Sequence, residues 1–488
     1  MLNFQMYEKV KVVYGNGAIN QLGELAKFMG ATKALIVADA GMIATGTVDK
    51  VKHGLENENI PYVVYDKVTP NPQLASVEEA YDILVKEECD MVIGVGGGSN
   101  MDAAKGVNIL RFNEGPLLQY ANGAKHFECG SGLIMVPTTA GTGSEMSDGS
   151  ILSDENHIKQ NFISDQGAFA EYAIVDPELM AGMPPKLTAS TGIDALAHAV
   201  ESYTGTLTNG FIHFYAEKIM DTIAEYLPQA VEDGSNMVAR EKMAVAAAQA
   251  GFLLIYGHTH AGHSIGQTVG GYFDIPHGTA CAYALPLVLE FNAPAVPELT
   301  KNVGKAFGVK FTGSETPEEI GKMTKDALNT FIYDKCKMPS IKTFAYDESK
   351  FEEIAKAISY HSKVIVLDEP TSSLTAPEVE KLFKMMRQLK AQGISLIYIS
   401  HKMDEIFEIC DEISVLRDGS LVMTKDSKDT DMNELISAMV GRSLDNRFPP
   451  VDNEPGETVL TVQNLSTKFA PKIQNISFDI RKGEIFGF

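Results

Sequence analysis

Four side chains in the middle of the sequence could hold a divalent metal ion. Asp194 and His198 lie four residues apart in a segment with helical patterning, so both face the same side of that helix. His263 follows on a predicted helix, and His277 lies in the predicted turn Pro-His-Gly. One carboxylate and three imidazoles form a mixed oxygen and nitrogen donor set that suits iron(II) or zinc.

Composition alone does not choose among the histidines. His258 and His260 lie close to His263 in the sequence and carry the same ligating group. A single histidine in a folded protein is more often a hydrogen-bonded core or surface group than a ligand. The prediction therefore depends on the four-residue set rather than on any one member.

Two glycine-rich segments follow predicted strands and could bind the phosphates of a nucleotide. Residues 94–99 (GVGGGS) precede a helix that we expect to start near Asp102, and residues 137–144 read PTTAGTGS. Glycine lets the backbone approach a phosphate, and a helix N-terminus presents N–H groups to it. A tight strand-to-helix turn uses glycine as well, and the spacing is not GxGxxG. The predicted phosphate-binding residues are Gly96, Gly97, Gly98, Ser99, Thr138, Thr139 and Thr142.

Asp39 directly follows the predicted strand at residues 34–38. A carboxylate there could accept hydrogen bonds from the ribose hydroxyls of NAD and would repel the 2′-phosphate of NADP. The alternative is that Asp39 caps the N-terminus of the next helix.

The pattern of predicted elements changes twice along the chain. Short apolar runs alternate with helical segments over residues 1–186, which predicts an α/β domain with a parallel sheet that binds a dinucleotide. Residues 187–355 are rich in alanine and predict an all-helical, metal-binding domain, with Pro184-Pro185 as the hinge. Residues 356–447 return to strand and helix patterning, and residues 448–488 combine an acidic, proline-rich linker with two antiparallel strands.

Composition excludes several classes of protein. The 41 Lys and Arg against 64 Asp and Glu give a net charge of −23, which argues against nucleic acid as a partner. The five cysteines form no CxxC pair, the N-terminus lacks a secretory signal pattern, and no apolar stretch reaches the length of a membrane span. We therefore expect a cytoplasmic protein without a membrane span.

Several motifs resemble those of the iron-dependent (group III) alcohol dehydrogenases. They are LTASTGIDALAHAVE at residues 187–201, GGGSNMDAAK at 96–105, PTTAGTGSE at 137–145 and HSIGQTVGGYFDIPHG at 263–278. The resemblance covers residues 1 to about 355, after which the closing helices of the family are missing. It implies a metal in the cleft between the two domains, a nicotinamide cofactor, a small alcohol or aldehyde as substrate, and a homodimer or larger assembly. The donor set favours iron(II) or zinc, and the carboxylate of Asp39 favours NAD over NADP.

The resemblance also assigns roles by motif position. It assigns Asp194, His198, His263 and His277 as the metal ligands. The fourteen-residue gap between the last two favours His263 over His258 and His260 as the third ligand. It adds two cofactor-binding residues, Asp102 and Lys159, and a catalytic position near the nicotinamide at Gln267. Many relatives have a histidine there, and glutamine can hydrogen-bond but cannot shuttle a proton.

The last part of the chain resembles a second family, the tandem ATPase subunits of bacterial sugar ABC importers. Residues 364–375 (VIVLDEPTSSLT) match a Walker B motif and D-loop, in which Asp368 would hold Mg²⁺ and Glu369 would polarise water. His401 matches the switch histidine, and residues 481–488 match the start of a second cassette. No GxxxxGK[ST] loop occurs in the sequence, so we expect no independent ATPase activity. A transporter ATP-binding subunit and an inactive fusion, joined within residues 354–360, are the alternative functions.

Overall fold

The computed structural model consists of two compact units, Met1–Tyr360 and His361–Phe488. The structure describes residues 5–155, 159–163, 168–273, 275–344, 350, 364–368, 370–371, 376–391, 393–417, 419–440, 455–467, 474–484 and 486.

The first unit begins with a six-stranded parallel sheet in the order β1-β8-β5-β4-β2-β3. The strands are β1 (Lys11–Tyr14), β2 (Ala34–Val37), β3 (Tyr62–Tyr65), β4 (Met91–Gly96), β5 (Leu133–Pro137) and β8 (Tyr172–Val175). The predicted parallel sheet is thus confirmed, and β1 is an edge strand that the apolar runs did not reveal. Strands β2, β4 and β5 are buried on both faces, which explains their continuous apolar sequences.

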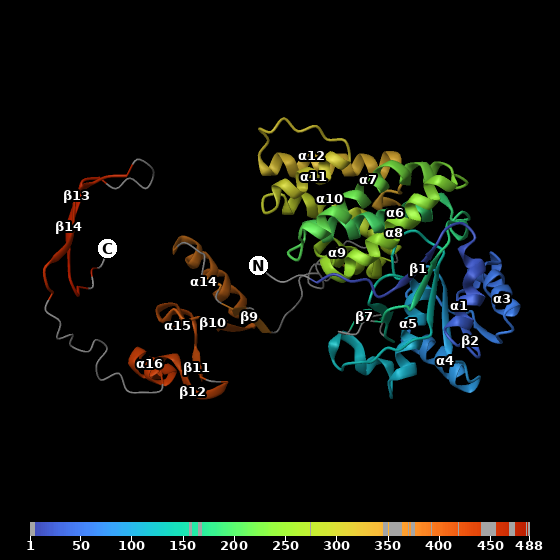
Figure 1. Ribbon diagram of the computed structural model, residues 1–488, viewed down its shortest axis with the longest axis horizontal. Coiled ribbons are helices and arrows are strands. Elements are labelled where there is room, and N and C mark those ends of the chain that lie inside the picture. The colour runs from blue at the N-terminus through green and yellow to red at the C-terminus, as the bar shows by residue number, and fades with distance from the viewer. Residues whose placement is uncertain are drawn as a thin grey trace. The chain divides into compact units, whose positions relative to one another are not determined.

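Helices cover both faces of this sheet (Figure 1). Alternate strand residues such as Ile36 and Ile93 pack with α1 and α3, while Leu35 and Val92 pack with α4 and α5. The helices of this region are α1 (Leu22–Phe28), α2 (Ala40–Ala44), α3 (Thr47–Asn57), α4 (Leu74–Lys86) and α5 (Gly98–Phe112). An antiparallel hairpin, β6 (Ser150–Ser153) and β7 (Lys159–Phe162), packs near α5.

The second region of the unit is helical, as predicted. Helix α6 is buried along nearly its whole length from Thr188 onward, because α7, α8 and α10 pack around it. The helices are α6 (Pro185–Thr204), α7 (Gly210–Glu232), α8 (Met237–Gly257), α9 (Ala261–Phe273), α10 (His277–Asn292), α11 (Pro297–Ala306) and α12 (Pro317–Asn329). The core on one face of the sheet continues into α6, α7 and α8, so the two regions share packing. Among the described helices, none is both long and apolar enough to cross a membrane.

The second unit contains strand and helix elements that match the predicted ones. Strands β9 (Val364–Asp368) and β10 (Ser395–Ile399) pair in parallel, with α14 (Ala376–Ala391) between them in sequence. Two antiparallel pairs follow, β11 (Glu412–Arg417) with β12 (Ser420–Asp426) and β13 (Thr458–Leu465) with β14 (Ile476–Arg481). Helices α15 (Met403–Ile409) and α16 (Met432–Val440) complete the described elements. The predicted junction at 354–360, Glu369 and most of the linker lie outside the described residues.

Candidate metal and nucleotide site

Three helices bring the four predicted metal ligands together. Asp194 and His198 lie one turn apart on α6, His263 lies on α9, and His277 is the first residue of α10 rather than part of a turn. Oδ1 of Asp194 lies 3.6 Å from Nε2 of His263, 3.5 Å from Nε2 of His277 and 3.9 Å from Nε2 of His198. The rings of His198 and His263 stack with their centroids 4.6 Å apart. The carboxylate oxygen thus lies within 4 Å of three imidazole nitrogens.

Buried polar atoms in this cluster lack partners within the described protein. Asp194, His198 and His263 are 2%, 4% and 8% exposed. Oδ1 of Asp194 and Nε2 of His263 are both buried without a hydrogen bond from the described residues. Leaving such atoms unsatisfied is costly, so a group that accepts their lone pairs is expected here. A divalent cation fits this donor set.

The charges in the cluster influence one another. Burial by itself would raise the pKa of Asp194, but the surrounding imidazoles, His198 first, bring it below its ordinary value. Burial lowers the pKa of His198 to about 4. The neighbouring Cys281 and then Asp194 outweigh burial at His277 and raise its pKa to about 9. The metal-free cluster therefore holds its carboxylate ionised and keeps His198 neutral at pH 7.

Two further residues of the cluster were not singled out from the sequence. Glu201, on α6, is fully buried and accepts a hydrogen bond from Nδ1 of His263 at 2.5 Å. Cys281, on α10, is also fully buried, and its Sγ lies 3.7 Å from Nε2 of His277. Both follow a predicted ligand by about one or two helical turns, so the spacing rule that linked Asp194 to His198 could have found them.

The alternative histidines lie elsewhere. His258 follows α8 and is exposed. His260 lies beside the cluster rather than in it: its Nε2 is 3.1 Å from Oγ1 of Thr204, and its backbone N–H donates to Glu201. Gln267 is half-buried on α9, one turn after His263.

The first glycine-rich loop lies at the carboxyl end of β4. Gly96 has a φ of 140°, a conformation that favours glycine, and helix α5 starts at Gly98, four residues earlier than predicted. Gly97 gives that helix no side-chain cap. In the sheet order, β3 lies on the outer side of β2, whereas β5 lies on the opposite side of β4, so the order in which successive strands are added reverses between β2 and β4. Nucleotides bind at such a reversal, at the carboxyl ends of the strands.

Asp39 lies at the same reversal, after β2. Its Oδ1 accepts a hydrogen bond from the backbone N–H of Met42 at 3.1 Å, so it caps α2. Its Oδ2 accepts another from Nδ2 of Asn100 at 2.6 Å, which joins it to the start of α5. Both expectations for Asp39 are thus geometrically compatible, since the cap uses one oxygen and leaves the carboxylate beside the glycine loop.

The second glycine-rich loop follows β5 and packs against the first. A Cβ on Gly98 would lie 2.8 Å from the methyl group of Thr142. A Cβ on Gly97 would lie 3.5 Å from the side chain of Thr139. Thr138 is buried, and its backbone N–H donates to the carbonyl of Gly96. The two loops therefore form one surface at the end of the sheet.

Asp102 and Lys159 are the two remaining predicted cofactor-binding residues. Asp102 accepts hydrogen bonds from Oγ of Ser144 at 2.8 Å and from the backbone N–H of Ile151, which ties α5 to the second loop and to β6. Nζ of Lys159 donates to Asn71 at 2.6 Å. Burial lowers the pKa of Lys159, and the nearby charge of Asp102 opposes that change.

The second loop also contacts two helices of the helical region, α6 and α8. A Cβ on Gly141 would lie 2.5 Å from Cβ of Thr191, three residues before Asp194 on α6. A Cβ on Gly143 would lie 2.3 Å from Cα of Gly251 on α8. The predicted nucleotide loop and the predicted metal ligands are thus held in close proximity by direct packing between small residues.

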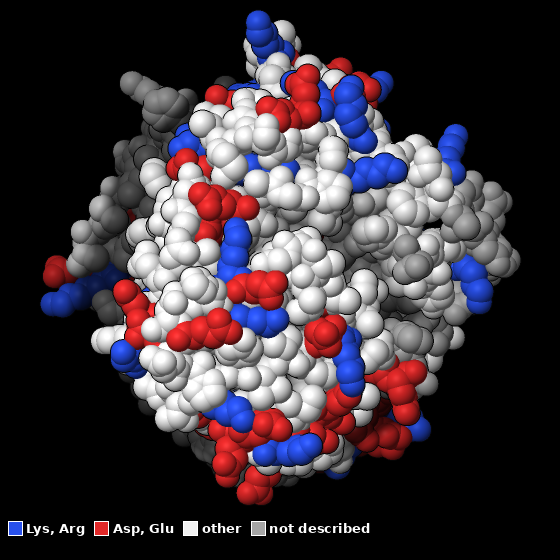
Figure 2. Space-filling model, turned by 90° about the vertical axis from the view of Figure 1, so that its right-hand side faces the viewer, with Lys and Arg blue, Asp and Glu red and all other residues white. Residues whose placement is uncertain are grey.

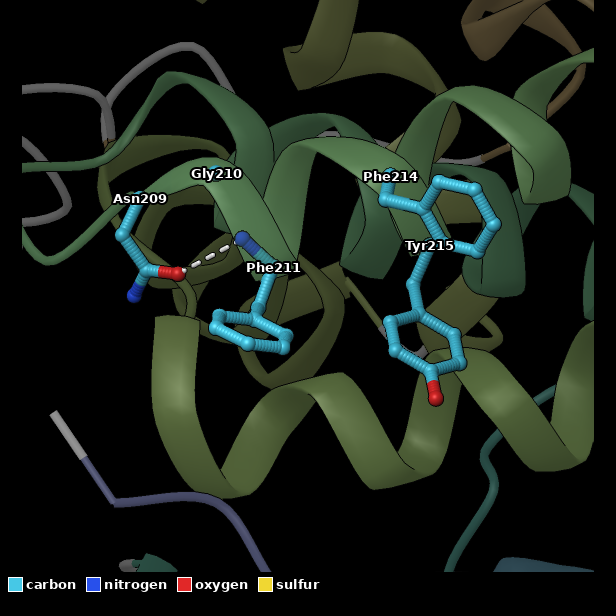
Figure 3. Close-up of a pocket in the computed structure, with 5 residues that line it drawn as sticks. All are labelled: Asn209, Gly210, Phe211, Phe214 and Tyr215. Carbon is cyan, nitrogen blue, oxygen red and sulfur yellow. Dashed lines mark hydrogen bonds between the residues drawn. The ribbon is translucent and has the colours of Figure 1, made fainter.

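A pocket at the start of α7 lies away from these residues. It has a volume of about 560 Å³ and is lined by the first turns of α7, where Asn209 caps the helix by accepting from the N–H of Phe211 (Figure 3). Phe211 and Phe214 are 64% and 74% exposed. None of the predicted site residues lines this pocket, so we do not expect it to be the active site.

The charged surface is mixed where it is visible. On the face shown in Figure 2, Lys and Arg side chains lie mostly singly among Asp and Glu side chains. This distribution is in line with the acidic composition.

Comparison with known proteins identifies the first unit. Residues 9–177 match the family model "Iron-containing alcohol dehydrogenase", and residues 188–386 match "Fe-containing alcohol dehydrogenase family, C-terminal". The second match runs past residue 355 into the part of the chain that resembles the importer ATPases. The chain is 36% identical to choline dehydrogenase of Bacillus subtilis (strain 168) over 362 residues, which are 73% of this chain and 89% of that protein.

A solved structure shares the fold of the first unit. The crystal structure of a 1,3-propanediol oxidoreductase superposes with a TM-score of 0.68 at 33% sequence identity, covering 72% of this chain and 93% of that one. The α/β sheet domain and the helical domain both lie within this likeness.

The remainder of the chain has a different relative. A segment of 147 residues is 60% identical to the galactose/methyl galactoside import ATP-binding protein MglA of Treponema denticola. This segment is 30% of this chain and spans 30% of that protein. The predicted fusion is therefore supported. By its sequence, its fold and its two matching family models, the chain belongs to the iron-containing alcohol dehydrogenase family, and it also carries a segment that is similar to part of a sugar-importer ATPase.

Proposed function

We propose that this protein is a metal-dependent, NAD-linked alcohol dehydrogenase or aldehyde reductase. The observation that carries the proposal is the convergence of Asp194, His263 and His277, with buried, unpartnered donor atoms, beside a loop that also packs on the glycine loop of the sheet. Membership of the family supports the class of reaction, hydride transfer between an alcohol and nicotinamide.

The predicted site residues would have separate roles in binding the metal ion, binding the cofactor and positioning the substrate. A divalent iron or zinc ion, when bound by Asp194 and the histidines, would supply positive charge that stabilises negative charge on a substrate oxygen. The glycine loop with Ser99 and the three threonines would hold the pyrophosphate, and Asp39 would accept from the ribose hydroxyls. Gln267, one turn from His263, would orient the nicotinamide or substrate by hydrogen bonding without taking up a proton.

Several finer points belong to the same proposal. We infer NAD preference from the carboxylate of Asp39, which would repel a 2′-phosphate. The substrate would be a small alcohol or aldehyde, and the active form a homodimer or larger. All five cysteines are unpaired, which favours a reducing compartment such as the cytoplasm.

The experiment that tests the function is aldehyde-dependent consumption of NADH by the full chain, purified without air, with and without added iron(II). Asp194→Ala is the negative control, and Asp221→Ala, an exposed position on α7, is the matched control. We expect turnover that iron stimulates in the wild type and in the α7 variant, and no turnover in Asp194→Ala. Absence of turnover from iron-loaded wild type with a broad aldehyde panel would contradict the proposal.

The importer-like segment contributes no catalysis in this proposal. In this segment Asp368 matches the Walker B aspartate and His401 matches the switch histidine of the importer ATPases. The sequence contains no GxxxxGK[ST] loop that could bind the phosphates of ATP. We therefore infer that the full chain does not hydrolyse ATP. Release of inorganic phosphate from ATP and Mg²⁺ above that of a His401→Ala variant would contradict this inference.

A further inference from the structure

Cys281 occupies a place in the metal cluster that the predicted ligand set does not account for. It lies one turn after His277 on α10, so the two side chains share a face of the helix. Its Sγ is 3.7 Å from Nε2 of His277, and the side chain is fully buried. A Cβ on Gly266 of α9 would lie 2.9 Å from this sulfur, so glycine at that position makes room for it.

The distances between donor atoms can be compared with those of a tetrahedral site. Metal bonds of about 2.1 Å to nitrogen or oxygen and about 2.3 Å to sulfur imply edges of about 3.4 Å between nitrogen and oxygen and about 3.6 Å between nitrogen and sulfur. Oδ1 of Asp194 lies 3.6 Å and 3.5 Å from Nε2 of His263 and of His277. The 3.7 Å between His277 and Cys281 fits the longer edge equally well.

The remaining predicted ligand fits less closely. Nε2 of His198 lies 3.9 Å from Oδ1 of Asp194. Among the described residues, donor atoms of Asp194, His263, His277 and Cys281 all lie within 4.8 Å of one another, and His198 does not belong to this set. Two of these atoms, Oδ1 of Asp194 and Nε2 of His263, are the buried ones without a partner among the described residues. The sulfur thus shares the space that these unpartnered atoms face.

We propose that Cys281 is a metal ligand of this site, donating its sulfur as a thiolate beside Asp194, His263 and His277. The proposal rests on the proposed function, because it concerns the same metal centre. On binding, a bond forms between Sγ and the metal, and the thiol proton leaves to the solvent. A thiolate softens the donor set, so the site should favour zinc over iron(II) more strongly than one aspartate and three histidines would.

Cobalt(II) is the probe for this proposal, because a thiolate bound to cobalt gives an intense near-ultraviolet charge-transfer band that oxygen and nitrogen ligands do not. The metal-free full chain is titrated with cobalt(II) alone, and both the band and the number of ions bound per chain are measured. Cys281→Ser removes the sulfur at little change in size. Cys336→Ser is the matched control, since Cys336 is equally buried and free but is outside the cluster.

We expect the wild type and Cys336→Ser to bind one cobalt ion with the band, and Cys281→Ser to bind cobalt without it. Asp194→Ala should lose the ion and the band together, which places the thiolate at this centre. Cobalt bound by the wild type without the band, or a band that persists in Cys281→Ser, would overturn the role of Cys281 while leaving the metal site intact. Absence of any stoichiometric cobalt binding would instead overturn the metal centre, and the cysteine ligand with it.

A second readout does not depend on cobalt. Competition between zinc and iron(II) for the metal-free chain should shift toward iron in Cys281→Ser and stay unchanged in Cys336→Ser. An unchanged preference in Cys281→Ser would contradict the proposal even if that variant is less stable, because both metals bind the same folded protein.

Discussion

Glu201 fixes the orientation of His263. Its Oε2 lies 2.5 Å from Nδ1 of that imidazole, and its Oε1 accepts the backbone N–H of the same residue at 3.0 Å. A proton on Nδ1 leaves Nε2 with its lone pair, and Nε2 faces Oδ1 of Asp194 at 3.6 Å. A buried carboxylate behind a histidine ligand is a common way to hold the ring in its ligating tautomer. Gly262 permits this contact, since a Cβ there would lie 2.1 Å from Oε1.

Replacing Glu201 with glutamine should weaken metal binding. The amide keeps the size of the side chain but removes the charge that holds the proton on Nδ1. We expect metal affinity to fall roughly 10- to 100-fold, measured by titrating the metal-free variant with zinc. Glu232→Gln, at an exposed position near the end of α7, should bind zinc as the wild type does. Equal affinities of the Glu201 variant and wild type would show that the carboxylate does not position the ring.

The sequence predicted the parts of this site that follow from local rules. Buried parallel strands have continuous apolar runs, and the loops after β4 and β5 are glycine-rich, so the nucleotide end of the sheet could be located in advance. The pairing of Asp194 with His198 followed from helical periodicity. What could not be predicted was which side chains from other helices reach the cluster. That depends on how α9 and α10 pack on α6, and hence on close contacts such as Gly278 against Ser190.

Asp39 shows the same limit at a single residue. The pattern allowed either a helix cap or a contact with the ribose, and only the structure shows that one oxygen caps α2 while the other accepts from Asn100. The start of α5 was predicted four residues late because glycine is a poor helix former, yet Gly98 begins the helix. Tertiary contacts with Thr142 decide the local conformation there.

The charge of Asp39 should set the preference for NAD. Glycine at this position would remove the cap and the charge together. Asp39→Asn keeps an oxygen that can cap α2 and removes the charge, together with the second oxygen that accepts from Asn100. Loss of at least about 1 kcal/mol of repulsion toward a 2′-phosphate should raise the ratio of kcat/KM with NADP to that with NAD by about fivefold or more. Steady-state kinetics with both cofactors measure this ratio. If Asp39→Asn leaves it unchanged, Asp39 acts as a cap alone.

Glu145 should make the stability of the protein depend on pH. It is 2% exposed, and burial raises its pKa to about 7 from an ordinary value of 4.5. The folded state therefore holds a proton that the unfolded state releases, and the free energy of unfolding should fall as pH rises from about 4.5 to 7. In Glu145→Gln this contribution is absent, so the variant should gain up to ~3 kcal/mol relative to wild type over that range. Urea unfolding at pH 5 and pH 7.5 gives the difference, and a constant difference between the two would refute the assignment.

Gly251 should be intolerant of any side chain, because α8 meets the second glycine-rich loop there. A Cβ on Gly251 would lie 2.2 Å from the carbonyl oxygen of Gly143 and 2.5 Å from its Cα, and these backbone atoms cannot move without displacing the loop. Alanine usually stabilises a helix relative to glycine by up to about 1 kcal/mol. Here the overlap should cost ~1–3 kcal/mol or more, so Gly251→Ala should be less stable than wild type.

Gly271→Ala is the matched control for this change. Gly271 is also helical, on α9, but has no atom within 4 Å of the position its Cβ would take, so alanine there should leave stability unchanged or raise it slightly. Because Gly143 lies in the loop that also contains Thr142, Gly251→Ala should in addition raise the Kd for NADH, measured by fluorescence titration of the folded variant. A Gly251→Ala protein with wild-type stability and cofactor affinity would mean that the loop yields to the new methyl group, and that its packing on α8 does not position the nucleotide.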